Sequence, residues 1–303
     1  MSAVVIDGKA VARKIRGEVK QRTALLREKG VAPCLAVILV GDDPASLSYV
    51  TAKEKALAEA GMESRDLRLA ADVTEAELLV LIDRLNRDEK VHGILVQLPL
   101  PRHINEDRVI TAIDPVKDVD GFHPVSVGNM VLGRDGFLPC TPHGILVLLQ
   151  ELAVPLSGAH AVVVGRSNIV GKPMANLLVR REANATVTIC HTGTKNLARH
   201  TLQADILIAA AGKAGLIAAE MVKPGAVVID VGVNRVPDPT REKGYRLCGD
   251  VDFAQVEKKA GYITPVPGGV GPMTIAMLLK NIIQTAEQTE TAKQTEAAGG
   301  CMI

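Results

Sequence analysis

The 303-residue chain has no tryptophan, and aromatic residues make up only 2% of it. Aromatic side chains are the platforms on which single-stranded nucleic acids stack, so their scarcity argues against a nucleic-acid partner. The 35 basic and 34 acidic residues leave a net charge of +1, which predicts no bulk attraction to nucleic acid or to a membrane surface. No apolar run approaches the roughly 20 residues that span a bilayer, so we expect no membrane partner either.

Paired cysteine motifs are also missing. The five cysteines are scattered and include no C-x-x-C pair, which argues against a disulfide scaffold and a structural zinc site. The first eight residues lack the charged region and apolar core of a signal peptide. We therefore expect a reduced, cytoplasmic protein.

What the chain does have is a long alternation of apolar strands and helices. Hydrophobic residues make up 47% of it, and its length predicts about two domains. Continuous apolar strands between helices predict an α/β fold with parallel sheets. The strands are expected at 35–40, 64–69, 91–96, 162–164, 186–189, 206–209, 227–231 and 262–264. Helices are expected at 10–29, 44–60, 74–87, 142–152 and 174–179, with caps at Asp43 and at Thr74, where Glu77 completes a capping box.

The stretch from His160 to Pro173 has the pattern of a nucleotide-binding turn. An apolar run ends in Gly165, and Gly171 follows six residues later at the start of an expected helix. Strand, tight turn and helix are the arrangement that holds a dinucleotide pyrophosphate. Ser167 stands where the second glycine of G-x-G-x-x-G would be, and an ordinary strand-to-helix turn is the alternative.

The residues around this turn favour NADP over NAD. Sites for NAD often place a carboxylate after the second strand, where it binds the ribose 2′-hydroxyl. Here that position carries His191, Thr192 and Lys195, and Arg166 lies in the first turn. These groups donate hydrogen bonds or positive charge, which suits a 2′-phosphate. The alternatives are a solvated loop charge at Arg166 and a surface histidine at His191.

A second group of polar residues predicts proton-transfer chemistry. Ser46, Tyr49 and Lys53 are spaced at i, i+3 and i+7 in an expected helix, so Tyr49 and Lys53 share a face. Lysine with a depressed pKa is a common proton-transfer group. On spacing alone, a solvated helix face is the more frequent explanation. Gln97 follows an apolar strand directly, and ligands of α/β proteins bind at such strand ends.

Two loops complete the candidate set. Residues 114–122 contain Asp114, Asp118 and Asp120, but no histidine at ligand spacing accompanies them, so we expect no metal. A solvated acidic turn is the alternative. Residues 265–274 are rich in glycine and proline, which permits close backbone approach to a ligand or forms a rigid turn between domains.

Five segments resemble those of a known family. The resemblance runs from about Ala10 to Ala286. In chain order they are Ser46 with Tyr49-Val-Thr-Ala-Lys53, Gln97-Leu-Pro-Leu-Pro101, Pro115-Val-Lys-Asp-Val-Asp-Gly121, Gly165-Arg-Ser-Asn-Ile-Val-Gly-Lys-Pro173 and Pro267-Gly-Gly-Val-Gly-Pro-Met-Thr274. This set closely resembles the bifunctional methylenetetrahydrofolate dehydrogenase/methenyltetrahydrofolate cyclohydrolase family.

The resemblance implies two domains around a cleft and a homodimer. The N-terminal catalytic and folate domain is expected at 1–145, completed by a C-terminal helix at 272–289. A Rossmann-type NADP domain is expected at 146–271, and residues 290–303 are expected to form a flexible tail.

The resemblance also implies roles for individual residues. Lys53 would be the key catalytic group with Gln97 as its partner, Tyr49 would stack on the folate, and Asp120 would hold the pterin. The implied catalytic set is Lys53, Tyr49, Gln97 and Asp120, and the implied substrate-binding set is Ser46, Tyr49, Gln97, Asp120, Pro267, Gly268 and Gly269. The implied cofactor-binding set is Gly165, Arg166, Ser167, Gly171, Pro173, His191 and Thr192, the last in place of a serine found in many relatives.

The implied function is a bifunctional folate enzyme of one-carbon metabolism. It would oxidise methylenetetrahydrofolate to methenyltetrahydrofolate with NADP and then hydrolyse the product to formyltetrahydrofolate. One alternative is an NADP oxidoreductase similar to shikimate dehydrogenase. Another is a non-catalytic dinucleotide-binding protein, which would keep Gly165 and Gly171 but would not need Lys53, Gln97 and Asp120 together.

Overall fold

The computed structural model describes residues 2–241 and 244–299, and the chain forms two compact units. The large-sheet unit comprises Met1–Arg13 and Met130–Thr274, and the small-sheet unit comprises Lys14–Asn129 and Ile275–Ile303. These bounds differ from the expected domain ranges of 1–145 and 146–271, because Met1–Arg13 and residues 130–145 fall in the large-sheet unit. The domain boundaries themselves stay a prediction.

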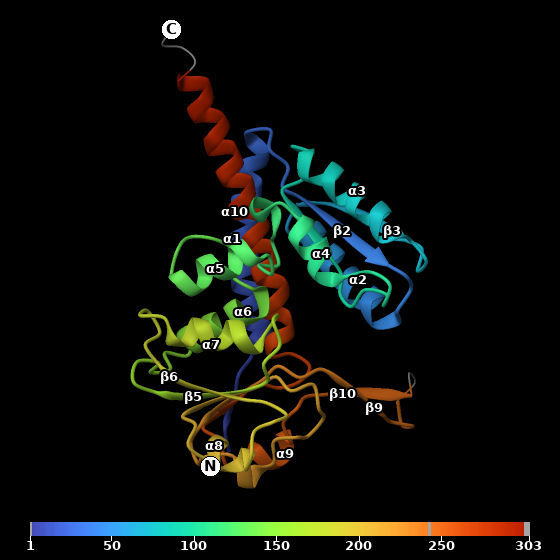
Figure 1. The fold of residues 1–303 in the computed structure, drawn as a ribbon. Helices are drawn as coiled ribbons and strands as arrows, with labels where there is room; N and C mark the ends of the chain where they lie inside the picture. The colour runs from blue at the N-terminus through green and yellow to red at the C-terminus, as the bar shows by residue number, and fades with distance from the viewer. Residues whose placement is uncertain (1, 242–243, 300–303) are drawn as a thin grey trace. The chain divides into compact units, whose positions relative to one another are not determined.

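The large-sheet unit is built on six parallel strands in the order β1-β11-β8-β7-β5-β6. Helices α6 and α7 lie on one face of this sheet, and α8 and α9 lie on the other (Figure 1). The strands are β1 (Val4–Val5), β5 (His160–Val164), β6 (Thr186–Cys190), β7 (Ile206–Ala209), β8 (Val227–Asp230) and β11 (Tyr262–Ile263). The helices are α6 (Cys140–Glu151), α7 (Gly171–Val179), α8 (Leu197–Thr201) and α9 (Phe253–Val256), with a 3-10 turn at Ala219–Met221.

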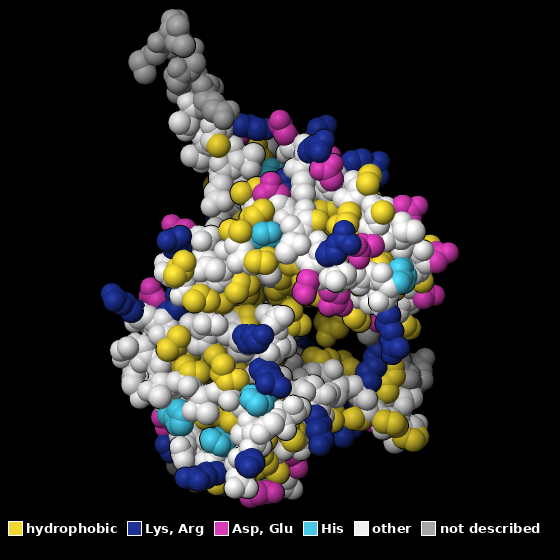
Figure 2. Space-filling view, viewed as in Figure 1, with side chains coloured by type: hydrophobic (Ala, Val, Ile, Leu, Met, Phe, Trp, Pro, Cys, Tyr) yellow, Lys and Arg dark blue, Asp and Glu magenta, His cyan; other side chains and the backbone are white. Residues whose placement is uncertain are grey.

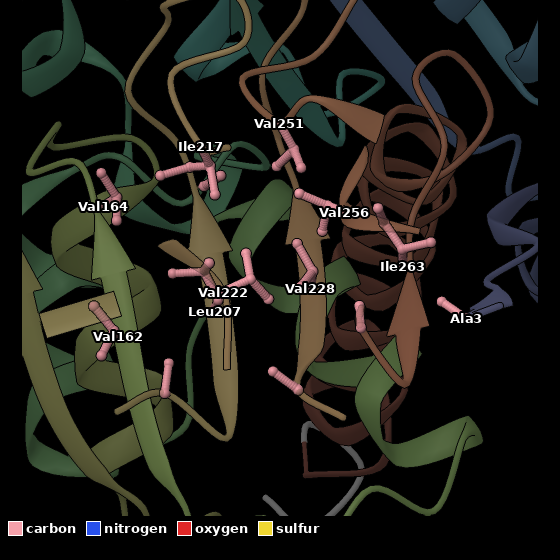
Figure 3. Close-up of a cluster of buried hydrophobic side chains, with 14 of the residues drawn as sticks. Ala3, Val162, Val164, Leu207, Ile217, Val222, Val228, Val251, Val256 and Ile263 are labelled. Carbon is pink, nitrogen blue, oxygen red and sulfur yellow. The ribbon is translucent and has the colours of Figure 1, made fainter. Parts of the chain in front are cut away.

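The apolar residues of these strands form the core of the unit. Strands β7 and β8 are buried at every position, as parallel strands covered on both faces should be. Side chains from neighbouring strands meet the loops and helices of one face in a single cluster (Figure 3). Its labelled members are Ala3, Val162, Val164, Leu207, Ile217, Val222, Val228, Val251, Val256 and Ile263. The predicted α/β fold with a parallel sheet is therefore confirmed.

The small-sheet unit contains a three-stranded parallel sheet in the order β3-β2-β4. Leu78, Ile82 and Leu85 of helix α3 pack on Ala36 and Ile38 of β2, so one sheet face is covered by this helix. The strands are β2 (Cys34–Val40), β3 (Glu63–Leu69) and β4 (Gly93–Val96). The helices are α2 (Pro44–Glu59), α3 (Glu75–Arg87) and α4 (Glu106–Ala112), with a 3-10 turn at Pro115–Lys117.

Both predicted helix caps of this unit are confirmed. The Asp43 side chain accepts a hydrogen bond from the Ser46 amide at 2.8 Å, and Pro44 opens helix α2. Thr74 and Glu77 exchange the two bonds of a capping box at the start of α3. Each cap contributes about 1 kcal/mol to helix stability, and the cap at Asp43 fixes where α2, the helix of Lys53, begins.

Three further helices contain residues of both units, namely α1 (Gly8–Glu28), α5 (Pro124–Leu132) and α10 (Val270–Gly299). Helix α10 extends beyond the expected 272–289 at both ends. Pro272 falls in its first turn, where a missing amide donor costs little. The polar segment after 285 is rich in alanine, glutamate and glutamine, which are good helix formers. Flexibility of 290–303 stays a prediction, and 300–303 lie outside the described residues.

Sequence reasoning also missed a hairpin in the large-sheet unit. Strands β9 (Asn234–Pro237) and β10 (Tyr245–Cys248) pair antiparallel after β8. In the space-filling view, basic and acidic side chains are interspersed, in keeping with the net charge of +1 (Figure 2). Among the described residues, no helix is both long and apolar enough to cross a membrane.

Candidate functional site

Lys53 and Gln97 are brought together by the small-sheet unit. Lys53 lies in α2, which follows β2, and Gln97 comes directly after the neighbouring strand β4. The Lys53 Nζ donates a hydrogen bond to the Gln97 Oε1 at 3.0 Å. Both side chains are partly buried. Because the carboxyl ends of parallel strands meet at one sheet edge, residues 44 positions apart in sequence become direct partners.

The amide of Gln97 is held in one orientation. Its Nε2 donates to the Leu98 carbonyl at 2.7 Å, and its backbone amide donates to the Ile38 carbonyl at 2.9 Å. With the Nε2 occupied in this way, the Oε1 is the atom that faces Lys53. A lysine ammonium has three donors, so two remain for a substrate or a water molecule.

Tyr49 and Ser46 lie on the same helix but in different surroundings. Tyr49 keeps 46% of its surface exposed, which leaves its ring available to stack on a flat ligand. Ser46 is buried, and its backbone amide is the donor to the Asp43 cap. The i, i+4 placement of Tyr49 and Lys53 on one helix is confirmed, whereas their roles stay predictions.

Asp120 is electrostatically linked to this lysine. It lies in the loop after the 3-10 turn Pro115–Lys117 and is partly buried. Burial raises the pKa of the Asp120 carboxyl, and the positive charge of Lys53 acts in the opposite direction. A carboxylate, an ammonium and an amide carbonyl therefore converge in the small-sheet unit.

Asp118 is a buried carboxylate that sequence reasoning did not separate from its neighbours. It accepts hydrogen bonds from the Phe122 amide at 3.2 Å, the His123 amide at 2.8 Å and the Ser126 hydroxyl at 2.7 Å. Burial raises its pKa to about 6, against these hydrogen bonds. Asp118 thus folds the loop that carries Asp120. Of these three partners, only the Ser126 hydroxyl depends on residue type, so it is the one local signal of this role in the sequence.

The nucleotide-type turn of the large-sheet unit is shaped by glycine. Gly165 has a φ of +136°, and a Cβ atom there would overlap the Ala210 carbonyl. A Cβ atom at Gly171 would overlap the Gly165 carbonyl. Both predicted glycines are therefore required by close backbone approach, and helix α7 begins at Gly171.

Ser167 takes a structural place in this turn. Its hydroxyl accepts from the amides of Val170 at 3.2 Å and Gly171 at 3.3 Å, so it caps the start of α7. Pro173 is buried in the first turn of α7. Arg166 is exposed and remains available to a ligand. The departure from G-x-G-x-x-G is thus explained by a hydroxyl that satisfies helix amides.

The end of β6 carries donors and no carboxylate. His191 is partly buried, its amide donates to the Thr194 hydroxyl at 2.8 Å, and its Nδ1 accepts from the Gly193 amide at 3.0 Å. Thr192 and Lys195 are exposed. The Gly193 amide occupies the Nδ1 of His191, so Nε2 is the ring nitrogen that remains for a ligand.

The loop of Pro267, Gly268 and Gly269 joins β11 to α10 in the large-sheet unit. Gly268 has a φ of +115°, and a Cβ atom at Gly269 would overlap the Thr264 side chain and the Pro265 carbonyl. The Gly269 amide donates to the Pro265 carbonyl at 2.9 Å. Packing of the loop is enough to explain both glycines, and its role in substrate binding stays a prediction.

Comparison with known proteins gives two family matches. Residues 6–120 match the catalytic domain of tetrahydrofolate dehydrogenase/cyclohydrolase. Residues 139–290 match the NAD(P)-binding domain of the same family. Together they span most of the chain, including Lys53, Gln97 and the turn at Gly165.

Individual relatives agree with these matches. Proteins named bifunctional protein FolD are 58% identical in Halalkalibacterium halodurans, over 95% of this chain and 100% of the relative, and 56% identical in Bacillus subtilis, over 95% and 99%. A crystal structure of FolD from Campylobacter jejuni has a TM-score of 0.90 at 52% identity, covering 95% of this chain and 99% of that chain.

Two further solved structures are similar to this chain, one at higher and one at lower sequence identity. A Trypanosoma brucei FolD complexed with NADP cofactor and inhibitor has a TM-score of 0.91 at 44% identity, covering 95% of this chain and 98% of that chain. A shikimate dehydrogenase from Aquifex aeolicus has a TM-score of 0.51 at 14% identity, covering 85% and 97%, which shows a shared fold alone. The chain belongs to the tetrahydrofolate dehydrogenase/cyclohydrolase family.

Proposed function

We propose that this protein oxidises methylenetetrahydrofolate with NADP and then hydrolyses the methenyl product to formyltetrahydrofolate. The observation that carries the proposal is the 3.0 Å hydrogen bond between Lys53 and Gln97, near the carboxylate of Asp120. These residues lie within the range that matches the family's catalytic domain, which ends at residue 120. The same chain carries the matching NAD(P)-binding domain.

The residues of the large-sheet unit fit NADP. Close backbone packing at Gly165 and Gly171 shapes the tight turn between β5 and α7, and a strand, tight turn and helix of this kind suit a dinucleotide pyrophosphate. Arg166, Thr192 and Lys195 are exposed donors, and residues 190–195 contain no carboxylate to repel a 2′-phosphate. Bound NADP would supply the acceptor for the hydride that leaves the substrate's methylene carbon. The protein contributes chiefly by orienting that carbon.

Hydrolysis of the methenyl product requires a proton to be moved. Lys53 is placed for this task because its ammonium is held by Gln97 while two donors stay free. The Leu98 carbonyl keeps the Gln97 Oε1 turned toward the lysine. Lys53 is therefore proposed as the proton-transfer group and Gln97 as the residue that orients it.

The remaining site residues are proposed to bind the folate. Asp120 presents two acceptor oxygens to the donor edge of the pterin, and the exposed ring of Tyr49 stacks on it. Ser46 supports the start of α2, and Pro267, Gly268 and Gly269 offer backbone groups to the substrate.

We further propose a cytoplasmic homodimer. Cys34, Cys190 and Cys248 are free thiols, which is usual in a reducing compartment. The homodimer rests on the family resemblance. Sedimentation of the purified protein tests it, because a mass near 32 kDa rather than twice that value would contradict a dimer.

The activity is tested by mixing the purified protein with methylenetetrahydrofolate and NADP and following the absorbance of the methenyl product. We expect methenyl product to form faster with NADP than with NAD. A shikimate-dehydrogenase-like enzyme or a non-catalytic nucleotide binder would produce no signal above the protein-free rate. That result would overturn the proposal.

A further inference from the structure

Two buried aspartates lie in the large-sheet unit outside every predicted site. Asp230 ends strand β8 and is 3% exposed, and Asp250 follows the β9–β10 hairpin and is 0% exposed. Burying a carboxylate is costly unless hydrogen bonds replace its hydration. The hydrogen-bond donors around Asp230 and Asp250 therefore show which segments of the chain these two carboxylates bind.

Asp250 binds the loop that follows β7. One carboxylate oxygen, Oδ2, accepts from the Ala211 amide at 2.6 Å and the Gly212 amide at 2.8 Å. The other oxygen accepts from the Asn234 side-chain amide at 2.9 Å. Both oxygens are thus used, and the two loop amides have a charged acceptor.

Asp230 holds Asp250 in turn. It accepts from the backbone amides of Asp250 at 2.9 Å and Val251 at 3.0 Å. A Cβ atom at Gly232 would overlap the Asp250 carboxylate, and one at Gly249 would overlap that of Asp230. The pair is packed without space for either carboxylate to shift toward these two glycines.

The loop that Asp250 binds is in direct contact with the nucleotide-type turn at Gly165. The Ala210 amide donates to the Val164 carbonyl at 2.8 Å, and the Ala210 carbonyl occupies the space where a Cβ atom of Gly165 would lie. Any movement of Ala211 and Gly212 is therefore transmitted through Ala210 to Gly165.

We propose that Asp250 is a positioning residue for the NADP site. It fixes the loop Ala210–Gly212 against Gly165, and Asp230 fixes Asp250. The inference rests on the proposed function, because it takes the turn at Gly165 as the NADP site. Asp230 and Asp250 would therefore affect the affinity for NADP and not the reactions of the folate.

The test compares NADP affinity in the full-length wild type, Asp250→Ala and Asp250→Asn by calorimetric titration. Asp250→Ala leaves two loop amides without their acceptor and should weaken NADP about tenfold. Asp250→Asn keeps a weaker acceptor oxygen for both amides and should weaken NADP less, by about two- to threefold. Hydrolysis of methenyltetrahydrofolate without NADP should stay within about twofold of wild type in both variants, whereas a general structural role would lower it as well.

Asp252→Ala is the matched control. Asp252 is exposed two residues further on and caps α9 through the Gln255 amide at 3.4 Å. Its NADP affinity should equal that of the wild type. Unchanged NADP affinity in folded Asp250→Ala, or an equal loss of NADP-independent hydrolysis, overturns the proposal. Failure of the wild type to bind NADP would instead contradict the proposed function.

Asp250→Asn decides the matter if Asp250→Ala does not fold. Loss of the charge weakens the acceptor, so the Ala211 and Gly212 amides should exchange with deuterium faster than in the wild type. Faster exchange together with a measurable loss of NADP affinity, up to about threefold, supports the proposal. Exchange or affinity equal to that of the wild type overturns it.

Discussion

The candidate residues of the two units are positioned in opposite ways. In the small-sheet unit, Lys53, Gln97 and Asp120 are partly buried side chains, and two of them are joined by a 3.0 Å hydrogen bond. In the large-sheet unit, Arg166 and Thr192 are exposed, and the shape of the turn comes from Gly165 and Gly171. The first set is held by contacts between side chains, whereas the second set lies on a turn whose shape is determined by backbone packing.

This difference predicts how the two regions respond to substitution. A side chain that moves a proton acts on the rate of a chemical step. A side chain on an exposed turn acts on ligand affinity and leaves the rate at saturation nearly unchanged. Substitution of the proposed proton-transfer residue in the small-sheet unit should therefore lower kcat, and substitutions of exposed residues around Gly165 should raise KM for NADP.

The largest effect is expected for Lys53→Met. The substitution keeps an apolar stem but removes the ammonium, so methenyl hydrolysis should fall by about 10² or more. NADP affinity should persist, because the residue lies outside the large-sheet unit. Hydrolysis assays and NADP titration on one preparation measure both. Lys55→Met is the control, since that side chain is 78% exposed on the same helix; hydrolysis by Lys53→Met within about twofold of wild type would remove the proposed role.

Asp120→Asn should weaken folate binding by about 1–3 kcal/mol, the scale for a partner left unsatisfied in a partly buried site. The new amide places a donor against pterin donors. A metal site at Asp120 makes a different forecast, because chelator would then inactivate the enzyme and a divalent cation would restore it. Folate titration of the variant with and without chelator separates the two. Unchanged folate affinity would contradict anchoring by Asp120.

Arg166→Ala should raise KM for NADP by about tenfold through loss of a charged hydrogen bond to the 2′-phosphate. Weak use of NAD should change little, because NAD lacks that phosphate. Steady-state kinetics with both nucleotides measure the split. Lys172→Ala is a suitable control, because this exposed lysine of the same turn donates to Asn168 at 2.7 Å. An equal loss with NADP and NAD would show that Arg166 is structural.

The last prediction concerns Asp118 and its effect on stability, with no change expected in the chemical step. Burial raises its pKa from 3.8 to about 6 in the folded state, so the folded protein binds this proton more tightly than the unfolded chain. The contribution of Asp118 to the free energy of unfolding is therefore full below about pH 4 and falls by about 3 kcal/mol as pH rises from about 4 to above 6.

Asp118→Asn removes that titration. Denaturant unfolding at pH 4, 5, 6 and 7 should show the stability of wild type relative to the variant decreasing with rising pH. A difference that stays constant over this range would mean that Asp118 has an ordinary pKa in the folded protein.

Local signals in the sequence were sufficient for part of the fold. The caps at Asp43 and Thr74 act within four residues, so residue type alone places them. Strand β1 could not be predicted, because Val4 and Val5 are exposed and pair with residues about 260 positions away. The early start of α10 was missed because Pro272 was taken as its first residue, although proline is equally tolerated later in the first turn.

The residues of the candidate site also fall into those that local sequence signals predict and those that depend on tertiary structure. Helical spacing put Tyr49 and Lys53 on one helix face, but the contact from Lys53 to Gln97 came from the family resemblance, because strand order determines it. Asp118 and Asp250 look like other acidic loop residues in the sequence. Their burial depends on amide donors that the tertiary fold delivers, such as those of Ala211 and Gly212.

The most direct test of two separable regions is the rate of methenyltetrahydrofolate hydrolysis by the wild-type protein with no nucleotide present. All the proposed proton-transfer groups lie in the small-sheet unit. We expect hydrolysis well above the uncatalysed rate in the absence of NADP. Hydrolysis at the uncatalysed rate, restored only when NADP is added, would contradict it.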